Sequence, residues 1–180
     1  MNSYFKTLKF LLFTFTILSI TSCKNDTLTN STFVKNNTEL KTAITNASPG
    51  TNIVLKDGIY KDAQIKFYAI GTKDKPITLK AENPGKVFFE GKSFLHLGGE
   101  HLIVDGLYFR NGYSPEISIL RYRIGKDSTA FNSRITNTVI KNFTKPNRLT
   151  NDHWIEFYGK HNKIDHCYIE GKSNDGETIR

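Results

Sequence analysis

The 180-residue sequence has little cysteine and few of the short motifs that mark common enzyme classes. It has only two cysteines, Cys23 and Cys167, which is too few for a framework of several disulfides. It has no glycine-rich phosphate-binding loop, no nucleophile elbow and no paired-carboxylate motif, which argues against enzymes built on those devices. Its apolar run over residues 10–20 has 11 residues and is too short to cross a bilayer as a helix.

That apolar run follows a short basic segment, residues 1–9, and predicts a signal peptide over residues 1–22. The small residues Thr21 and Ser22 before Cys23 resemble the bacterial lipoprotein box. This resemblance implies that Cys23 is lipidated and becomes the mature N-terminus. It also implies an exported protein on the outer membrane or surface of a Gram-negative bacterium, bound to the membrane only through its lipid anchor. The alternative is an ordinary secreted protein in which Cys23 is a free thiol.

Residues 23–33 are polar and rich in Thr and Asn, and predict a tether that leads to one domain over residues 34–180. The chain is 38% hydrophobic and 12% aromatic, which is enough for a core. Removing residues 1–22 takes away Lys6 and Lys9 and lowers the formal charge from +8 to +6. A basic exported protein could bind an acidic polymer or lipid headgroups, while a merely solvated basic face is the alternative. We expect no nucleic-acid partner.

One pattern occurs three times in the chain. An aliphatic residue is followed by three variable residues, an aromatic residue or Val, an aliphatic residue or Phe, a charge, and Asn or Gly. The copies begin at Val104, Ile135 and Ile164, which are 31 and 29 residues apart. Short strands repeated at this interval predict a solenoid, the parallel β-helix, in which each coil covers the apolar face of the next. An antiparallel sandwich with coincidental spacing is the alternative.

Other segments predict the remaining elements. Leu40, Ala43 and Ile44 have helical spacing, with Asn37 or Thr38 as the N-cap, and this short helix would cover the open end of the stack. Interruption of the repeat between residues 111 and 132 predicts a lateral loop. Strands are expected at residues 52–55, 64–67, 76–81, 87–90, 94–97, 102–104 and 107–109.

Four segments in order, residues 49–60, 75–81, 102–109 and 161–172, resemble the N-terminal part of the alginate lyase and chondroitinase B family, polysaccharide lyase family 6. The resemblance covers about residue 33 to the C-terminus. It implies an all-β, right-handed parallel β-helix that cleaves uronic-acid polymers by β-elimination. Alginate is the favoured polymer, with chondroitin or dermatan as the alternative, so the expected partner is an acidic polysaccharide.

The resemblance also implies a site on one face of the helix, with a calcium ion held by one Asn and two Glu, a Lys base and an Arg. Those Glu, Lys and Arg motifs lie in coils beyond residue 180, so we expect a truncated chain that is inactive alone and holds no calcium alone. Residues 174–180 resemble the family's Asn-Gly-Gly-Glu-Thr-Ile-Arg stretch, which makes Asn174 the candidate metal ligand. In the family that stretch stands at least one coil beyond the segment matched by residues 171–174, so a coil is missing here. The rival functions are a non-catalytic carbohydrate-binding β-helix lipoprotein and an inactive gene fragment.

Four residues are candidates for contact with an anionic sugar. Arg121 and Arg123 could face its carboxylates, Tyr122 could stack on a ring, and Lys172 could lie on the substrate face, with solvated residues as the alternative. No catalytic residue is assigned. The histidines at 153, 161 and 166 lack partners with convincing ligand spacing and predict polar-corner or core positions.

Overall fold

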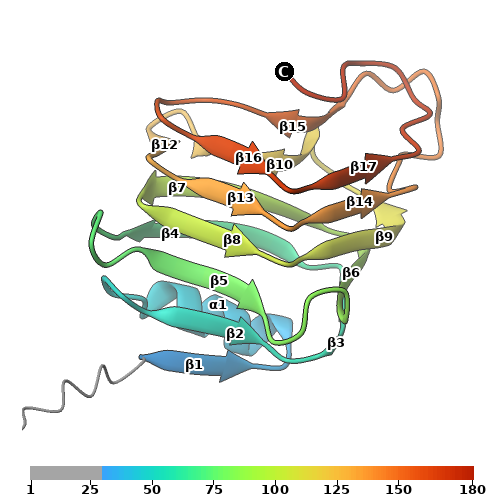
Figure 1. Ribbon diagram of the computed structural model, residues 1–180. Helices are drawn as coiled ribbons and strands as arrows, with labels where there is room; N and C mark the ends of the chain where they lie inside the picture. Colours follow the sequence, from blue (N-terminus) through green and yellow to red (C-terminus); the bar gives the residue numbers. More distant parts are fainter. Residues whose placement is uncertain (1–29) are drawn as a thin grey trace, which may run out of the picture.

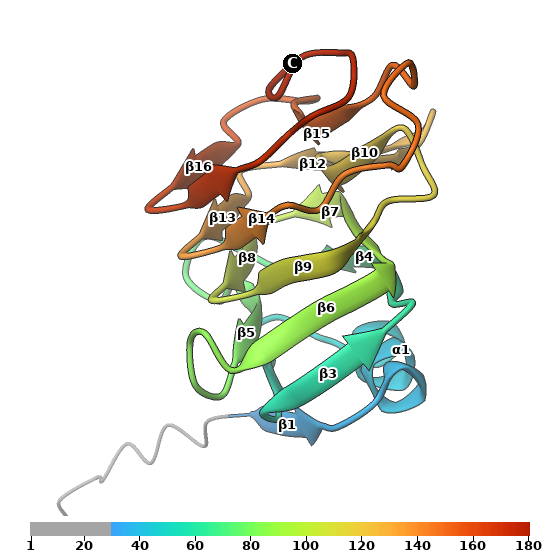
Figure 2. The ribbon, with the colours of Figure 1, turned by 90° about the vertical axis from the view of Figure 1, so that its right-hand side faces the viewer.

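The computed structural model describes residues 30–180, which form a parallel β-solenoid with one short helix (Figure 1). The predicted signal peptide and Cys23 lie outside these residues. The first sheet contains, in spatial order, β1 (Ser31–Val34), β2 (Asn52–Leu55), β5 (Ile77–Ala81), β8 (Leu102–Asp105), β13 (Arg134–Thr136) and β16 (Lys163–Asp165). The second contains β17 (Tyr168–Glu170), β14 (Val139–Lys141), β9 (Tyr108–Tyr113), β6 (Val87–Lys92) and β3 (Gly58–Lys61) (Figure 2).

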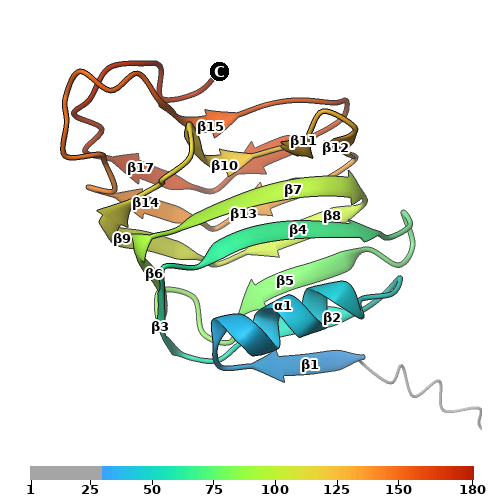
Figure 3. The same ribbon diagram turned by 180° about the vertical axis from the view of Figure 1, so that it is seen from behind.

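The third sheet is centred on β7 (Phe94–Glu100), which pairs with three other strands (Figure 3). These are β4 (Gln64–Ile70), β10 (Ser118–Arg121) and β12 (Ser128–Phe131). At the end of the sheet β15 (His153–Glu156) pairs with β10, and β11 (Arg123–Gly125) forms an antiparallel hairpin with β12. All other strand pairs are parallel, so the chain returns to each sheet once per coil.

The register confirms the repeat found in the sequence. Ile135 pairs with Val104 on one side and with Ile164 on the other. In the second sheet Val139 likewise lies between Tyr108 and Tyr168. Equivalent residues of successive coils therefore stack directly on one another, which is the arrangement that a solenoid requires.

The corners explain why Asn, Gly and His recur at the repeat interval. Each coil turns at residues with positive φ, a conformation that glycine adopts freely and that short polar side chains tolerate best. Three corners recur in three successive coils at the same 31- and 29-residue spacing. They are His101, Asn132 and His161; Gly106, Asn137 and His166; and Asn111, Asn142 and Gly171. The histidine prediction is confirmed, since His161 and His166 lie at polar corners and His153 is buried within β15.

Apolar side chains fill the interior as ladders parallel to the solenoid axis. In the second sheet Tyr60, Phe89 and Phe109 stack with ring centroids 5.5 and 5.0 Å apart, and Phe143 continues the ladder at 5.6 Å. All four rings are buried. Such stacking places each coil's aromatic residue on the next and fixes the register as well as the core.

Helix α1 (Asn37–Thr45) covers the N-terminal end of the solenoid beneath β4, as predicted (Figure 3). Its buried residues are Leu40, Ala43 and Ile44. The predicted N-cap at Asn37 or Thr38 is wrong by one or two positions, because the Asn36 side chain accepts the bond from the Glu39 amide N–H. No helix in residues 30–180 has the length and apolar character needed to cross a membrane.

Three boundaries differ from the prediction. Residues 31–33, assigned to the tether, belong to β1, because parallel pairing with β2 satisfies their backbone groups despite their exposed side chains. The predicted lateral loop over 111–132 contains β10, β11 and β12, because β10 and β12 return to pair with β7. Cys167 lies in the corner after β16 instead of within a strand. There it is half-buried against the core, and burial raises the pKa of its thiol.

Candidate functional site

The register places ionisable side chains in one line across the third sheet. Lys66 of β4 pairs with His96 of β7, His96 with Arg121 of β10, and Arg121 with Glu156 of β15. Arg180 continues the line, since Ile179 forms a β-bridge with Ile155. Adjacent strands lie about 4.8 Å apart, so neighbouring members of this ionisable row can interact directly.

The Arg121–Glu156 pair is the best shielded contact of the row. Arg121 Nε lies 3.0 Å from Glu156 Oε2, and the side chains are only 17% and 4% exposed. Neither atom has a partner with hydrogen-bond geometry, so the contact is an ion pair and not an aligned hydrogen bond. Arg121, predicted to contact substrate, is therefore already neutralised by a carboxylate of its own chain.

His96 is buried beside this pair and carries no charge at neutral pH. Burial lowers the pKa of its imidazole to about 4, with the Arg121 charge as a smaller contribution. The ring packs on Phe94 with centroids 4.3 Å apart, and Nε2 lies 3.3 Å from the carbonyl oxygen of Ser118, to which the neutral tautomer can donate. The row therefore contains a neutral position between the Lys66 and Arg121 charges.

Arg123 and Tyr158 form a cation and aromatic pair at the edge of the row. The Arg123 guanidinium lies 4.0 Å from the centroid of the Tyr158 ring, and the Arg121 guanidinium lies 5.4 Å from it. Both Arg123 and Tyr158 are partly exposed. A guanidinium can bind a carboxylate and an aromatic face can contact the apolar side of a sugar ring, so this pair has the chemistry that an acidic sugar requires.

Tyr122 does not belong to this surface, and the prediction that it stacks on a sugar is wrong. Its side chain is fully buried, with its ring stacked on Phe157 at 5.0 Å. Its hydroxyl donates to the backbone oxygen of Lys163 at 2.6 Å, and burial raises its pKa. The side chain points inward because the flanking Arg121 and Arg123 point outward along the extended chain.

A second contact at this end of the sheet was missed in the sequence. His153 is 3% exposed and lies between two residues of the last segment. Its Nδ1 is 3.0 Å from Glu177 Oε2, and its Nε2 is 3.1 Å from Arg180 Nη1. The only signal in the sequence was the resemblance of residues 174–180 to a stretch of the family. That resemblance does not reveal that Glu177 and Arg180 contact His153.

Lys172 and Asn174 lie at a different corner, away from the ionisable row. Lys172 Nζ donates to the backbone oxygens of Asn174 and Asp175, both at 2.7 Å, and its side chain is 8% exposed. Asn174 is buried, and its Oδ1 accepts a 2.6 Å bond from Thr144 Oγ1. The prediction that Lys172 contacts substrate is wrong for this conformation, because its ammonium is directed into the protein.

With the Lys172 ammonium in place, the residues around Asn174 do not fit the implied calcium site. Calcium prefers six to eight oxygen ligands, several of them carboxylates. Here the ammonium of Lys172 lies 3.4 Å from Asn174 Oδ1 and competes for the same oxygen. Within residues 30–180 there is no group of three or more His, Cys, Asp or Glu side chains that could hold a metal.

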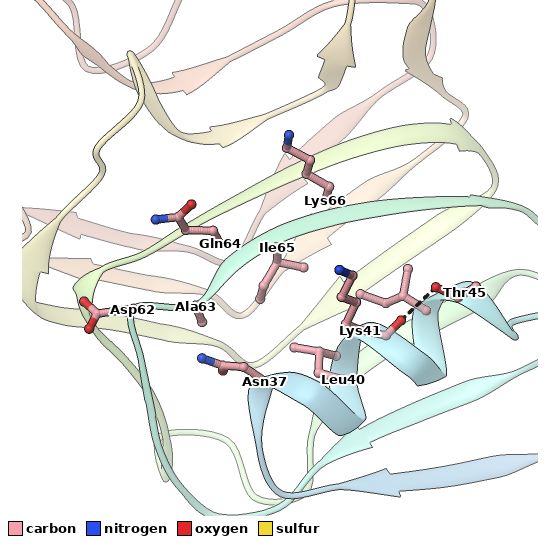
Figure 4. A pocket seen from close by; sticks show the side chains of 10 residues that line it. Asn37, Leu40, Lys41, Thr45, Asp62, Ala63, Gln64, Ile65 and Lys66 are labelled. Carbon is pink, nitrogen blue, oxygen red and sulfur yellow. Dashed lines mark hydrogen bonds between the residues drawn. The ribbon is translucent and has the colours of Figure 1, made fainter.

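A cavity of about 440 Å³ lies between α1 and β4 at the N-terminal end (Figure 4). Leu40, Ile44 and Ile65 form its apolar part, and Lys41 and Lys66 lie at its rim. Lys66 is also the first member of the ionisable row. The cavity has no cluster suited to catalysis, so we place the candidate site at the opposite end of the sheet, around Arg123 and Arg180.

The comparisons with known proteins agree with the fold. Residues 34–180 match the family model described as Chondroitinase B. The PL6 family alginate lyase AlyGC is 43% identical with a TM-score of 0.81, over 83% of this chain and 20% of that chain. The PL6 family polysaccharide lyase Pedsa3628 from Pseudopedobacter saltans is 34% identical with a TM-score of 0.73, over 79% and 32%.

A mannuronic acid specific polysaccharide family 6 lyase from human gut microbiota is 29% identical with a TM-score of 0.75, over 83% of this chain and 36% of that chain. No protein with a curated description matches the chain. The chain thus spans about a fifth to a third of the length of these solved relatives. Because the family model covers residues 34–180, this chain belongs to the chondroitinase B family, polysaccharide lyase family 6.

Proposed function

We propose that residues 34–180 are the N-terminal coils of a lyase that cleaves uronic-acid polymers by β-elimination, with alginate as the preferred polymer. Chondroitin or dermatan is the alternative substrate. The observation that carries this proposal is the 43% identity over 83% of the chain to a protein described as an alginate lyase. Since the chain spans only 20% of that relative, the activity is proposed for the whole protein and not for these coils alone.

The reaction explains why further coils are needed. β-Elimination requires neutralisation of the uronate carboxylate, a base that removes the C5 proton and an acid that assists the leaving oxygen. A calcium ion, when bound, supplies the first of these through its charge. The family resemblance implies that the carboxylates, the Lys and the Arg for these roles lie beyond residue 180. The contribution proposed for this chain is therefore to bind and orient the polymer.

We assign that binding to the exposed groups at the end of the third sheet. Arg123 is supported by the face of Tyr158, and Arg180 follows the β-bridge at the open end of the sheet. Arg121 contributes less, since Glu156 neutralises it. An anionic sugar chain that reaches these coils would meet Arg123 beside the Tyr158 ring, which combines charge with contact area, and the exposed Arg180 would add a second cation.

Residues 23–180 are expected to bind alginate without cleaving it. Assayed with calcium, they should give no rise in the ultraviolet absorbance of unsaturated uronate above a heat-killed control, because the described residues hold no metal cluster. The same protein should be retained on immobilised alginate, with retention that falls as salt rises. Arg123→Ala should weaken retention about threefold, as expected for one exposed charge contact.

Lys163→Ala is the matched control, because Lys163 is equally cationic but is paired with Asp165 in the first sheet. Equal loss in the two variants would place binding elsewhere. Turnover by residues 23–180 would show that Lys172, Arg180 or another residue of this chain performs the chemistry. It would overturn the proposal that these coils bind the polymer while later coils carry the catalytic groups.

A non-catalytic carbohydrate-binding β-helix is the second candidate, and it is supported by the partly exposed Arg123–Tyr158 pair, which could bind an acidic sugar without any catalytic group. An inactive gene fragment is the third. The coding sequence after codon 180 distinguishes them. An in-frame continuation with Glu-x-Glu, Asn-Lys-Ser and Arg-His-Gly motifs would support the lyase, whereas a stop codon would support the rivals.

We also propose that Cys23 carries the lipid anchor of an exported protein. The full-length chain should partition with membranes and incorporate labelled fatty acid, and Cys23→Ala should lose both properties. Several acyl chains are expected, since one chain alone gives only reversible membrane binding. Cys167→Ala is the control and should keep the label. Labelling that persists in Cys23→Ala would rule out this attachment site.

A further inference from the structure

We infer that the corner around Lys172 is an internal cation site whose native occupant is the lysine's own ammonium group. Lys172 Nζ lies 2.7 Å from the backbone oxygens of both Asn174 and Asp175. Two side-chain oxygens complete the surroundings, Asn174 Oδ1 at 3.4 Å and Asp152 Oδ1 at 3.6 Å. The Lys172 side chain is 8% exposed. This inference holds whether or not the chain acts on a polysaccharide.

The surroundings have the composition of a site for a hard cation. All four neighbours are oxygens, and one belongs to the carboxylate of Asp152, which is only 6% exposed. Backbone carbonyls, an amide oxygen and a carboxylate are the ligand types that proteins use for calcium. An ammonium ion can occupy the same position because its three N–H groups donate to oxygens in much the same directions.

Asn174 is held in place by every hydrogen-bonding atom of its side chain. Its Nδ2 donates to Asp152 Oδ1 at 2.6 Å and to the Thr150 backbone oxygen at 2.9 Å. Its Oδ1 accepts from Thr144 at 2.6 Å and faces Lys172. The amide therefore joins two chain segments 30 residues apart and has no orientation left in which Oδ1 could turn outward.

The backbone closes the same corner from the other side. Asp175 O, which accepts from Lys172, also accepts from the backbone N–H of Asp152 at 3.2 Å. Gly176 has a φ of +92°, and a Cβ there would lie 2.1 Å from Asp152 O. Only glycine fits this approach, so the oxygens around the ammonium are fixed by the fold and not by Lys172 alone.

The consequence is a corner that does not depend on metal. A calcium ion bound to Asn174 Oδ1 would lie next to an ammonium 3.4 Å from that oxygen, and like charges at this distance repel. Lys172 thus acts as a built-in counter-ion for Asp152, together with the more distant Lys145 at 3.8 Å.

Thermal unfolding with and without calcium tests this inference. The melting temperature of the full chain should not change with calcium. Lys172→Ala should lower it by about 5 °C through loss of the buried contacts, and calcium should restore part of that loss by entering the vacated position. Lys172→Met is the matched control. It should melt at a similarly reduced temperature and not recover, because its side chain fills the position without charge.

Three outcomes would overturn the inference. Recovery of neither variant, or of both equally, would show that these oxygens are not a cation site. Calcium stabilisation of the unmodified chain that disappears in Asn174→Ala would show that metal is the native occupant.

Chemical labelling provides a test that does not require the variants to fold. In the unmodified chain an amine-reactive reagent should label Lys172 at least about tenfold more slowly than Lys163, since Lys172 reacts only after local opening of the corner. Lys163 is the reference because its side chain is 64% exposed. Equal labelling rates would overturn the assignment, because they would place the Lys172 ammonium in solvent.

Discussion

Replacing Ile140 with aspartate should unfold the solenoid, whereas the same change at the adjacent Val139 should leave it folded. Ile140 is 1% exposed and stacks between Phe109 and Ile169, while Val139 points to the outer face between Tyr108 and Tyr168. The Ile140 change removes a buried side chain and buries a carboxyl group without a partner, at a combined cost of at least about 4 kcal/mol. A domain with a total stability of about 5–15 kcal/mol loses much or all of it.

Circular dichroism and urea unfolding of the two variants measure this effect. Val139→Asp should change the free energy of unfolding by no more than about 1 kcal/mol, because its side chain remains in contact with water. The pair controls for charge and strand, since both variants place one aspartate in β14 and the main difference is the direction of the side chain. Equal stability of the two variants would mean that the inward and outward faces of β14 are assigned the wrong way round.

Stability should fall by about 2 kcal/mol between pH 7 and pH 5 because of His96 alone. Burial lowers the pKa of this imidazole to about 4, against about 6.5 in an unfolded chain. The folded state therefore binds fewer protons in this window. The stabilisation is complete above about pH 6.5 and is lost as the pH falls toward 4. In this window the His96 imidazole gains a proton when the chain unfolds, and this proton uptake favours the unfolded state.

Urea unfolding at a series of pH values, compared with the His96→Gln variant, tests this prediction. Glutamine retains an N–H donor for the carbonyl of Ser118 but has no proton to gain, so the dependence between pH 7 and pH 5 should become nearly flat. The same slope in both proteins would show that His96 is protonated in the folded state and that another group sets the pH dependence.

The sequence was sufficient to predict the solenoid and its register. Each coil must present apolar residues to the same interior and must turn at positions that accept positive φ. Both requirements produce a periodic pattern in the sequence, seen at Val104, Ile135 and Ile164 and at the corners that follow. The helix at the N-terminal end could be predicted for a similar reason, because its apolar spacing differs from that of a strand.

The direction of individual aromatic side chains could not be predicted in the same way. Tyr168 and Tyr122 both lie in aromatic clusters of the sequence, yet Tyr168 is 54% exposed and Tyr122 is fully buried. Strands here are often only three or four residues long, and a positive-φ corner between them resets which side chains face inward. Alternation within so short a strand does not fix its inner face.

The candidate site was predictable only in part, because its contacts join separate coils. Arg121 was recognised as a cation, but its partner Glu156 is brought beside it by strand pairing across 35 residues. His153 meets Glu177 and Arg180 in the same manner. A residue type suggests what a side chain can bind, whereas the pairing of coils decides whether it is already occupied by its own chain.

The recurrence of three corners per coil makes the coil a unit that evolution can add or delete whole. A gain or loss of about 30 residues preserves which side chains face inward and leaves each remaining strand with an equivalent neighbour. Residues 174–180 stack on the preceding coil in the same way, since Ile179 forms a parallel bridge with Ile155. Whole-coil changes of this kind can alter the length of the outer face, and with it the number of sugar units within reach, without redesign of the core.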